Sequence, residues 1–400
     1  MSKISIINSL LIVSFLTCVS AVAKSIDAMP PEATSSELKF SYSELPYLSK
    51  AFIDPTPALR KDGLPVGELG VDGGNKEILI KFAKEIADYK HGFYDSFLIS
   101  HKGKLIFESY FSKGRVNLPH YQASATKSYT GLALGRAIQL GFLTMSDLNK
   151  PVISFFKDLD KTTLTKGVEK ITLLHALTMT SGIRISDEQW QVYRKIPSQF
   201  KGLGELQTRL EQSTPITEAS QVFKYGIGPL LIMHVVEAVV PGSAKDFIKR
   251  ELLDKLDITN YRWMTNGASG LPEAGWRTSM MSRDMLKWGM LIRNKGKWQG
   301  EQLVPAEFIS NATMRQVYTG DEEVHFGGKD VSNRGYGYFW WGTDLKVGDK
   351  KIYNTTAQGG NGQLIMFIEE LDLIVVHTAH DNKAPYKQVI AEHILPAFVN

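Results

Sequence analysis

The stretch QASATKSYTG, residues 122–131, places Ser124 and Lys127 three positions apart, where a long apolar helix is expected to begin. The apolar pattern continues to about Gly141, and glycine is a residue that commonly ends helices. The same serine-x-x-lysine spacing occurs three more times, at Ser36–Lys39, Ser154–Lys157 and Ser198–Lys201. Spacing alone therefore says little about chemistry, and the surroundings of each pair must distinguish them.

Only the pair at 124 and 127 follows a predicted hairpin and opens an apolar helix. Residues three apart on a helix share a face, so the Lys127 amine can reach the Ser124 hydroxyl. The helix N-terminus favours the negative charge that develops during reaction. An apolar interior lowers the pKa of a lysine toward the range in which its neutral amine can act as a base. The pattern predicts a nucleophile and its activating group. The competing interpretation is an ordinary surface serine and lysine at a helix start.

The other three copies have surroundings that explain them without chemistry. Ser36 lies in an extension with no following helix, and Ser154 lies in a segment where buried and exposed positions alternate. Ser198 lies between Pro197 and Gly202, which favour a loop.

Strand patterns occur at both ends of the chain and helical patterns between them. Residues 96–100 and 104–111 read as two strands joined by a tight turn, and 76–89 as a helix before them. Further strands are predicted at 335–341, 362–370 and 371–378, helices at 173–182, 228–240 and 243–256, and a last helix at 387–398. Short turns between sequential strands favour an α/β (α+β) fold, with a mainly antiparallel sheet flanked by helices and an inserted all-helical domain.

The expected domain organisation follows from these segments. We expect a signal peptide at 1–23 and an N-terminal extension at 24–75. An α/β domain follows in two pieces, 76–123 and 275–400, and a helical domain at 124–274 carries the nucleophile helix at the interface.

The N-terminus has the layout of a secretory signal: Lys3, an apolar stretch over 6–19, and the small-x-small sequence Ala21–Ala23. We therefore expect a periplasmic or secreted protein, with no stable membrane insertion after cleavage near Ala23. An uncleaved membrane anchor is the alternative. Cleavage would remove Cys18, the one cysteine of the chain, so neither disulfides nor thiol chemistry is expected.

Charge and histidine spacing limit the kinds of partner and cofactor that we expect. The net charge is +4 among 400 residues, with no run of basic residues, so no nucleic-acid partner is expected. The histidines show no metal-binding spacing, His377 and His380 being the one close pair, and we expect no metal and no cofactor. The oligomeric state stays open.

Several segments besides SATK together resemble the serine β-lactamase and penicillin-binding-protein superfamily. The likeness is to its class C side, which includes esterases and aminohexanoate-dimer hydrolases, and it covers roughly residues 90–395. The segments are ITLLHALTMTSGI (171–183), FKYGIG (223–228), the return to the sheet at 275–309, YGYFWWG (336–342) and AQGGNGQ (357–363).

The resemblance implies a β-lactamase/transpeptidase-like fold and a set of site residues. Ser124 would be the acyl-accepting nucleophile, Lys127 its activating partner, and Tyr225 the second acid/base that passes a proton to the leaving group. The backbone N–H groups of Ser124 and Gly360 would form the oxyanion hole. A core aromatic at Tyr225 and turn glycines at 359 and 360 are the competing interpretations.

Two positions depart from the family pattern. Ile227 stands where the tyrosine motif usually has Asn, and Ala357 stands where the third motif usually has Lys or His. The missing cation removes a partner for the carboxylate of a β-lactam or of a peptide C-terminus. Both changes are compatible with the esterase and aminohexanoate-hydrolase branch.

Four further residues are candidates for the substrate pocket: Trp190, Tyr193, Asn361 and His377. Loop aromatics are often packing residues, and a histidine in an apolar strand is more often buried and hydrogen-bonded than functional. Trp340 and Trp341 are adjacent in a predicted strand, so one should face the core and the other the cleft or solvent.

These inferences predict a serine hydrolase (esterase or amidase) that cleaves a small ester or amide through an acyl-enzyme on Ser124. One alternative is a penicillin-binding D,D-peptidase or a class C-like β-lactamase. The other is a non-catalytic receptor or scaffold with the same fold.

Overall fold

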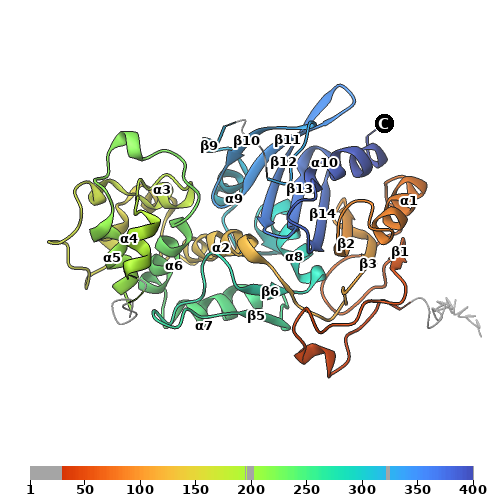
Figure 1. Cartoon of the computed structure of the whole chain (residues 1–400), viewed down its shortest axis with the longest axis horizontal. Coiled ribbons are helices and arrows are strands. Elements are labelled where there is room, and N and C mark those ends of the chain that lie inside the picture. The colour runs from red at the N-terminus through yellow and green to blue at the C-terminus, as the bar shows by residue number, and fades with distance from the viewer. Residues whose placement is uncertain (1–28, 194, 196–201, 321–324, 400) are drawn as a thin grey trace, which may run out of the picture.

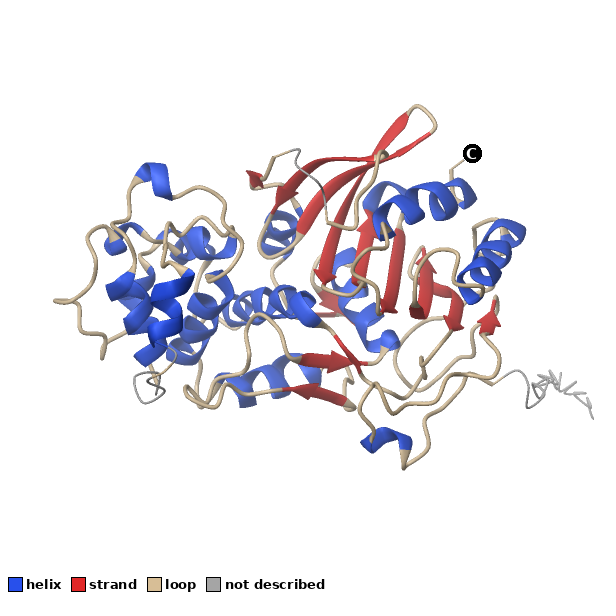
Figure 2. Ribbon diagram, in the orientation of Figure 1, coloured by secondary structure: helices blue, strands red, loops and turns tan. Residues whose placement is uncertain are grey.

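The computed structural model describes residues 29–193, 195, 202–320 and 325–399. The predicted signal peptide, residues 1–23, and the pair Ser198–Lys201 lie outside these residues. Across the described ranges, no helix is both long and apolar enough to cross a membrane. The large sheet lies at one end of the molecule and a group of helices at the other (Figures 1 and 2).

A nine-stranded sheet dominates the fold, and its neighbouring strands pair antiparallel throughout. This confirms the predicted α/β class with a mainly antiparallel sheet. The strand order is β1-β3-β2-β14-β13-β12-β11-β10-β9. The strands are β1 (Phe52–Asp54), β2 (Tyr94–His101), β3 (Lys104–Tyr110), β9 (Val317–Tyr318), β10 (Val331–Tyr336), β11 (Trp341–Val347), β12 (Lys350–Gly359), β13 (Gln363–Ile368) and β14 (Leu373–Ala379).

The central strands are apolar on both faces because both faces are covered. Along β13, Leu364 and Met366 belong to one buried apolar cluster, whereas Ile365 belongs to another. The second cluster lies on the side of α8 (Ser282–Arg293), which packs on β2, β13 and β14. The first lies on the side of α1 (Lys76–Ala87) and α10 (Tyr386–Val389) with the helical turns that follow it (Figure 1).

The hairpin between β2 and β3 follows directly from sequence. Lys102 and Gly103 form its two-residue turn, and both have positive φ, at 49° and 79°. A two-residue turn with both residues in this region matches the twist of antiparallel strands, and glycine enters it at little cost.

The helical part begins with α2 (Thr126–Gln139), which lies between the sheet and the remaining helices (Figure 1). Its residues are buried from Thr126 to Ile138, so it is a central helix with no solvent face. The helices that follow are α3 (Leu173–Leu177), α4 (Asp187–Tyr193), α5 (Gly204–Gln212), α6 (Gly228–Val239) and α7 (Ala244–Ile248). A separate small sheet consists of β4 (His120–Tyr121), β6 (Thr278–Met280) and β5 (Tyr261–Trp263).

Several details differ from the sequence expectations, and three of them concern the sheet and the helix predicted at 243–256. The segment 335–341 is not one strand, because a turn at 337–340 separates the end of β10 from the start of β11. The extension at 24–75 contributes an edge strand, β1, which pairs Phe52 with Tyr110 of β3. The predicted helix at 243–256 is only briefly α-helical and continues as a π-helical turn at Lys249–Leu253.

Candidate active site

Ser124 lies in a sharp turn between strand β4 and helix α2. The preceding Ala123 has a φ of 45°, an uncommon conformation for a residue with a side chain, and a short 3-10 turn at Ala123–Ala125 leads into the helix. Gln122 anchors the turn: its N–H donates to the Thr278 carbonyl at 2.8 Å, and its fully buried side chain accepts the Tyr129 hydroxyl at 3.0 Å. The nucleophile candidate is therefore held by a rigid backbone.

Lys127 contacts Ser124 as the three-residue spacing predicts. Its amine donates to the Ser124 hydroxyl at 2.9 Å and to the Gly275 carbonyl at 2.8 Å. The residue is 8% exposed, and burial lowers the pKa of the amine to about 8 because the charged form loses its water. A substantial fraction of the amine is then neutral near physiological pH and able to accept a proton.

Tyr225 lies beside Lys127 and is the third candidate catalytic residue. The Lys127 amine lies 4.7 Å from the centre of its ring, and that ring stacks on Trp341 at 5.4 Å. Although 38% of the residue is exposed, loss of water raises the pKa of its hydroxyl to about 12, while a hydrogen bond with Ser124 acts in the opposite direction. The phenol therefore carries its proton at neutral pH and can donate it.

The end of β12 packs directly against the nucleophile turn. A Cβ atom on Gly359 would lie 2.1 Å from the Gln122 carbonyl oxygen, so only glycine fits there. Gly360, which the resemblance makes an oxyanion-hole residue, comes next, and its carbonyl accepts the Gln363 side-chain amide at 3.4 Å. The structure thus brings the predicted Gly359–Gly360 segment beside Ser124 from more than 200 positions away in the chain.

The structure shows where Ala357 and Ile227, the two residues that depart from the family pattern, lie. Ala357 is fully buried in β12 opposite Ile365 of β13, and it offers only a methyl group. Ile227 is partly buried at the N-cap of α6 and packs against the apolar core. Neither side chain can pair with a substrate carboxylate.

Of the four pocket candidates, Trp190 on α4 lines a cavity of about 500 Å³. That cavity also borders Gly226, the neighbour of Tyr225, and Gly275, whose carbonyl contacts Lys127. Tyr193 lies on the same helix, and its hydroxyl donates to the Gln212 side chain at 2.6 Å. Its ring lies 6.5 Å from that of Trp190.

The other two candidates lie near the sheet. Asn361 occupies the β12–β13 turn with a φ of 66°, and its N–H donates to the Asn382 side chain at 2.5 Å. His377 is fully buried in β14, where Nδ1 faces the Gly362 carbonyl at 2.9 Å and burial lowers its pKa to about 3. Its expected place in the pocket is wrong: a histidine of the sheet interior cannot touch substrate.

Sequence reasoning missed two contributors. Gly275 acts through its backbone carbonyl, which no residue-type pattern reveals. Trp341 supports Tyr225, and the tryptophan pair gave a signal for it: Trp340 is 1% exposed in the core, whereas Trp341 faces the site.

Comparisons with known proteins show a family match and a shared fold. A family model described as Beta-lactamase matches residues 91–397. The chain is similar to the solved structure of a protein assigned as a beta-lactamase, from Bacteroides dorei DSM 17855, at 15% identity and a TM-score of 0.61, covering 80% of this chain and 98% of that one.

Two other solved structures are similar. EstCE1, a hydrolase with promiscuous acyltransferase activity, matches at 15% identity and a TM-score of 0.61, covering 82% of this chain and all of that one (100%). A protein assigned as a 6-aminohexanoate-dimer hydrolase, from Bacillus anthracis, matches at 17% identity and a TM-score of 0.57, covering 86% and 88%. At these identities the likeness shows the fold.

Proposed function

The chain belongs to the beta-lactamase family, and from that premise we propose that it is a serine hydrolase that cleaves a small ester or amide through an acyl-enzyme on Ser124. One observation carries the proposal most directly. A buried lysine amine with a pKa of about 8 lies 2.9 Å from a serine hydroxyl that a rigid turn holds in place. Such a contact allows the amine to take the serine proton and so supports a nucleophilic role for Ser124 at neutral pH.

In the proposed acylation, neutral Lys127 accepts the Ser124 proton as the serine oxygen forms a bond to the substrate carbonyl carbon. The oxyanion is stabilised by the backbone N–H groups of Ser124 and Gly360. As the carbonyl reforms, the bond to the leaving group breaks, and Tyr225 donates a proton to that group. Protonated Lys127 then returns a proton to the tyrosine oxygen.

Deacylation uses the same residues. A water molecule attacks the acyl carbon, giving up a proton to the neutral Lys127 amine. The bond to the Ser124 oxygen then breaks, and that oxygen regains a proton. The carboxylic acid product leaves with the enzyme restored.

The surroundings support an acyl group without a carboxylate. Ala357 provides no cation, which disfavours β-lactams and peptide C-termini. The neighbouring cavity is lined by apolar side chains such as Trp190, Trp276 and Leu271, and by charged ones, Glu205, Arg209 and Glu273. Glu205 and Arg209 pair with one another. The proposal is supported by the shared fold of proteins described as a hydrolase with promiscuous acyltransferase activity and as a 6-aminohexanoate-dimer hydrolase.

The test combines a fluorophosphonate probe with a fluorescent penicillin. Both are applied to the wild type, to Ser124→Ala, and to Ser154→Ala, a matched control from an exposed serine-x-x-lysine copy. We expect fluorophosphonate labelling of the wild type and the control but not of Ser124→Ala, together with turnover of ester or amide substrates. Penicillin labelling at Ser124 would favour the peptidase or β-lactamase alternative. Absence of any Ser124-dependent labelling would favour the receptor or scaffold.

We also propose that the protein acts outside the cytoplasm, in a periplasm or after secretion. The proposal is supported by the charged start, apolar stretch and Ala21–Ala23 site of residues 1–23. Cell fractionation and N-terminal sequencing test it: a mature chain beginning near Lys24 is expected, and a chain that keeps Met1 and stays with the membrane contradicts it.

A further inference from the structure

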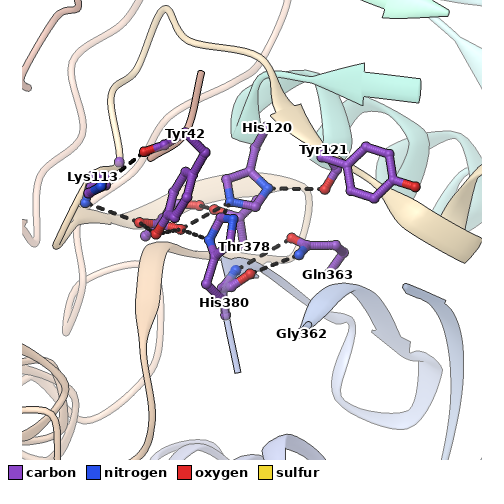
Figure 3. A network of polar contacts seen from close by, with 12 residues as sticks. Tyr42, Lys113, His120, Tyr121, Gly362, Gln363, Thr378 and His380 are labelled. Carbon is purple, nitrogen blue, oxygen red and sulfur yellow. Dashed lines mark hydrogen bonds and ion pairs between the residues drawn. The ribbon is translucent and has the colours of Figure 1, made fainter. Parts of the chain in front are cut away.

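A second cluster of polar side chains includes His120, four residues before Ser124 in the chain. Asp95 comes from β2, His120 from β4, and His380 directly follows β14. The Asp95 Oδ2 atom lies 3.0 Å from His120 Nε2 and 2.6 Å from His380 Nδ1, and those two nitrogens are 3.3 Å apart. Figure 3 shows the rings of Tyr42, His120 and His380 turned toward one another. Three atoms that can ligate a metal thus converge on one point.

Both nitrogens of His120 face oxygens that can only accept. Nδ1 lies 3.1 Å from the Tyr121 carbonyl oxygen, and Nε2 lies 3.0 Å from the Asp95 carboxylate. A bound metal ion would take the place of the Nε2 proton, while the Tyr121 carbonyl holds the proton on Nδ1. A backbone carbonyl that orients the far nitrogen is the usual second partner of a metal-bound histidine.

We propose that Asp95, His120 and His380 form a binding site for a divalent transition-metal ion, with Zn²⁺ the best match. Two imidazoles and one carboxylate are ligands that zinc prefers, and bonds of about 2.0–2.1 Å place tetrahedral ligand atoms roughly 3.3 Å apart. The observed separations are 2.6, 3.0 and 3.3 Å, so small side-chain movements accommodate the ion.

The surroundings of Asp95 hold it in a ligating position. The residue is 1% exposed, and its Oδ1 atom accepts the Lys113 backbone N–H at 3.1 Å. The Tyr42 hydroxyl lies 3.3 Å from each carboxylate oxygen, and its ring stacks on His380 at 3.3 Å. The Lys113 amine lies 4.9 Å over that ring and fixes it in turn.

A fourth ligand position is available beside the cluster. A cavity of about 160 Å³ is lined by His120, His380 and the hydroxyl-bearing Ser96 and Thr378. Lys113, Arg115 and Arg262 also line it; the Lys113 amine donates to the Tyr42 and Ser43 carbonyls, and Arg115 pairs with Glu37. The cavity is large enough for water, and polar groups line it. A water molecule can therefore complete a tetrahedral set.

The ion would join two segments that build the candidate active site. The His120 carbonyl accepts the Gln122 side-chain amide at 2.8 Å, two residues before Ser124. The Ala379 carbonyl accepts the Gln363 amide at 2.8 Å, and that amide also contacts Gly360. We therefore assign the ion a structural role: it fixes the nucleophile turn and the β12–β13 turn to one another.

The described residues contain another group of the same composition, Glu85, His91 and His393. Its carboxylate side chain is 22% exposed, against 1% for Asp95. Water competes more strongly for a metal ion at that exposed group, so the group serves as the matched control.

The experiment uses the untagged full chain, stripped with a chelator and titrated with Zn²⁺. We expect binding at a single site per chain and a rise in melting temperature on adding the ion, as linkage requires. In His120→Gln, His380→Gln and Asp95→Asn we expect affinity to fall by on the order of a hundredfold or more, since losing an outer partner already costs 10–100-fold. His393→Gln should bind like the wild type.

Cobalt substitution tests the site without any mutation. Co²⁺ added to the stripped wild type should give the visible absorption of a nitrogen- and oxygen-ligated ion, which Zn²⁺ abolishes. Failure of the wild type to bind either ion overturns the proposal, leaving a hydrogen-bonded carboxylate–histidine cluster. Loss of binding in His393→Gln but not in His380→Gln overturns it as well. Neither readout depends on hydrolase activity, so the proposal can fail while the proposed function stands.

Discussion

At the residue scale, the Lys127 amine loses water to lie beside Ser124, and that arrangement costs stability. Its pKa falls from 10.5 to about 8, which corresponds to roughly 3 kcal/mol against the charged form. Hydrogen bonds to Ser124 and Gly275 offset part of this cost. Sites tuned for chemistry commonly give up stability in this way.

We predict that Lys127→Met lowers kcat/KM by about 10³–10⁴-fold while leaving the melting temperature at pH 7 equal or higher. Methionine fills a similar volume without a charge to desolvate. The folded-state pKa lies below the unfolded one, so any stability gain is greatest below pH 8 and fades as pH rises toward 10.5. Thermal unfolding across this range measures it. A variant less stable than wild type at pH 7 would show that the Lys127 amine stabilises the folded protein overall.

The pH profile of acylation follows from the same group. Because Lys127 must be neutral to accept the serine proton, we predict that kcat/KM rises with pH and levels off above about 8. The Tyr225 phenol, with a pKa of about 12, stays protonated through this window. Stopped assays on one ester substrate from pH 6 to 10 give the profile. A rate independent of pH over that interval would remove Lys127 from the role of base.

At the scale of elements, the site depends on how closely β12 approaches the nucleophile turn. We predict that Gly359→Ala lowers kcat/KM by at least about 100-fold, since its Cβ would meet the Gln122 carbonyl oxygen at 2.1 Å and displace the strand from the oxyanion. Circular dichroism should show a retained fold. Gly267→Ala, at a glycine with open space around it, is the control expected to keep full activity. Equal activity in both variants would contradict a role for the strand.

Local pattern was enough for some elements and not for others. The hairpin of β2 and β3 was predictable because Lys102-Gly103 supplies a turn between two apolar strands. Helix α8 was missed because charged residues interrupt its apolar pattern, and in the fold Arg283, Asp284 and Lys287 are buried in ion pairs. Strand β1 was missed because three residues in a Pro- and Gly-rich extension become a strand only by pairing with β3.

At the scale of the whole molecule, one buried ion pair ties three parts of the fold together. Arg283 on α8 donates to both Glu108 oxygens, at 2.9 and 2.6 Å, and to Asp62 of the extension at 2.8 Å. The Arg283 and Glu108 side chains are 4% and 2% exposed. Removing one partner of such a pair leaves a buried charge without compensation.

We predict that Arg283→Met destabilises the protein by about 3–5 kcal/mol, measured by urea unfolding. The double variant Arg283→Met/Glu108→Gln should recover part of this loss, because the uncompensated carboxylate is then gone. Lys249→Met, which breaks an exposed pair with Asp254, is the control and should change stability by less than about 1 kcal/mol. A loss in Arg283→Met no larger than in the control would show that the pair adds little.

The sequence by itself determined the parts of this protein that depend on neighbours along the chain. The spacing of Ser124 and Lys127 places amine and hydroxyl on one helical face, and the family segments identified the fold and assigned Tyr225 and Gly360. Tertiary structure alone decided what depends on distant segments meeting. It put His377 inside the sheet, made the Gly275 carbonyl a partner of Lys127, and brought His120 together with Asp95 and His380, which are 25 and 260 positions away. Helical periodicity is a local rule, whereas such convergence is set by strand order and packing, which no spacing in the sequence encodes.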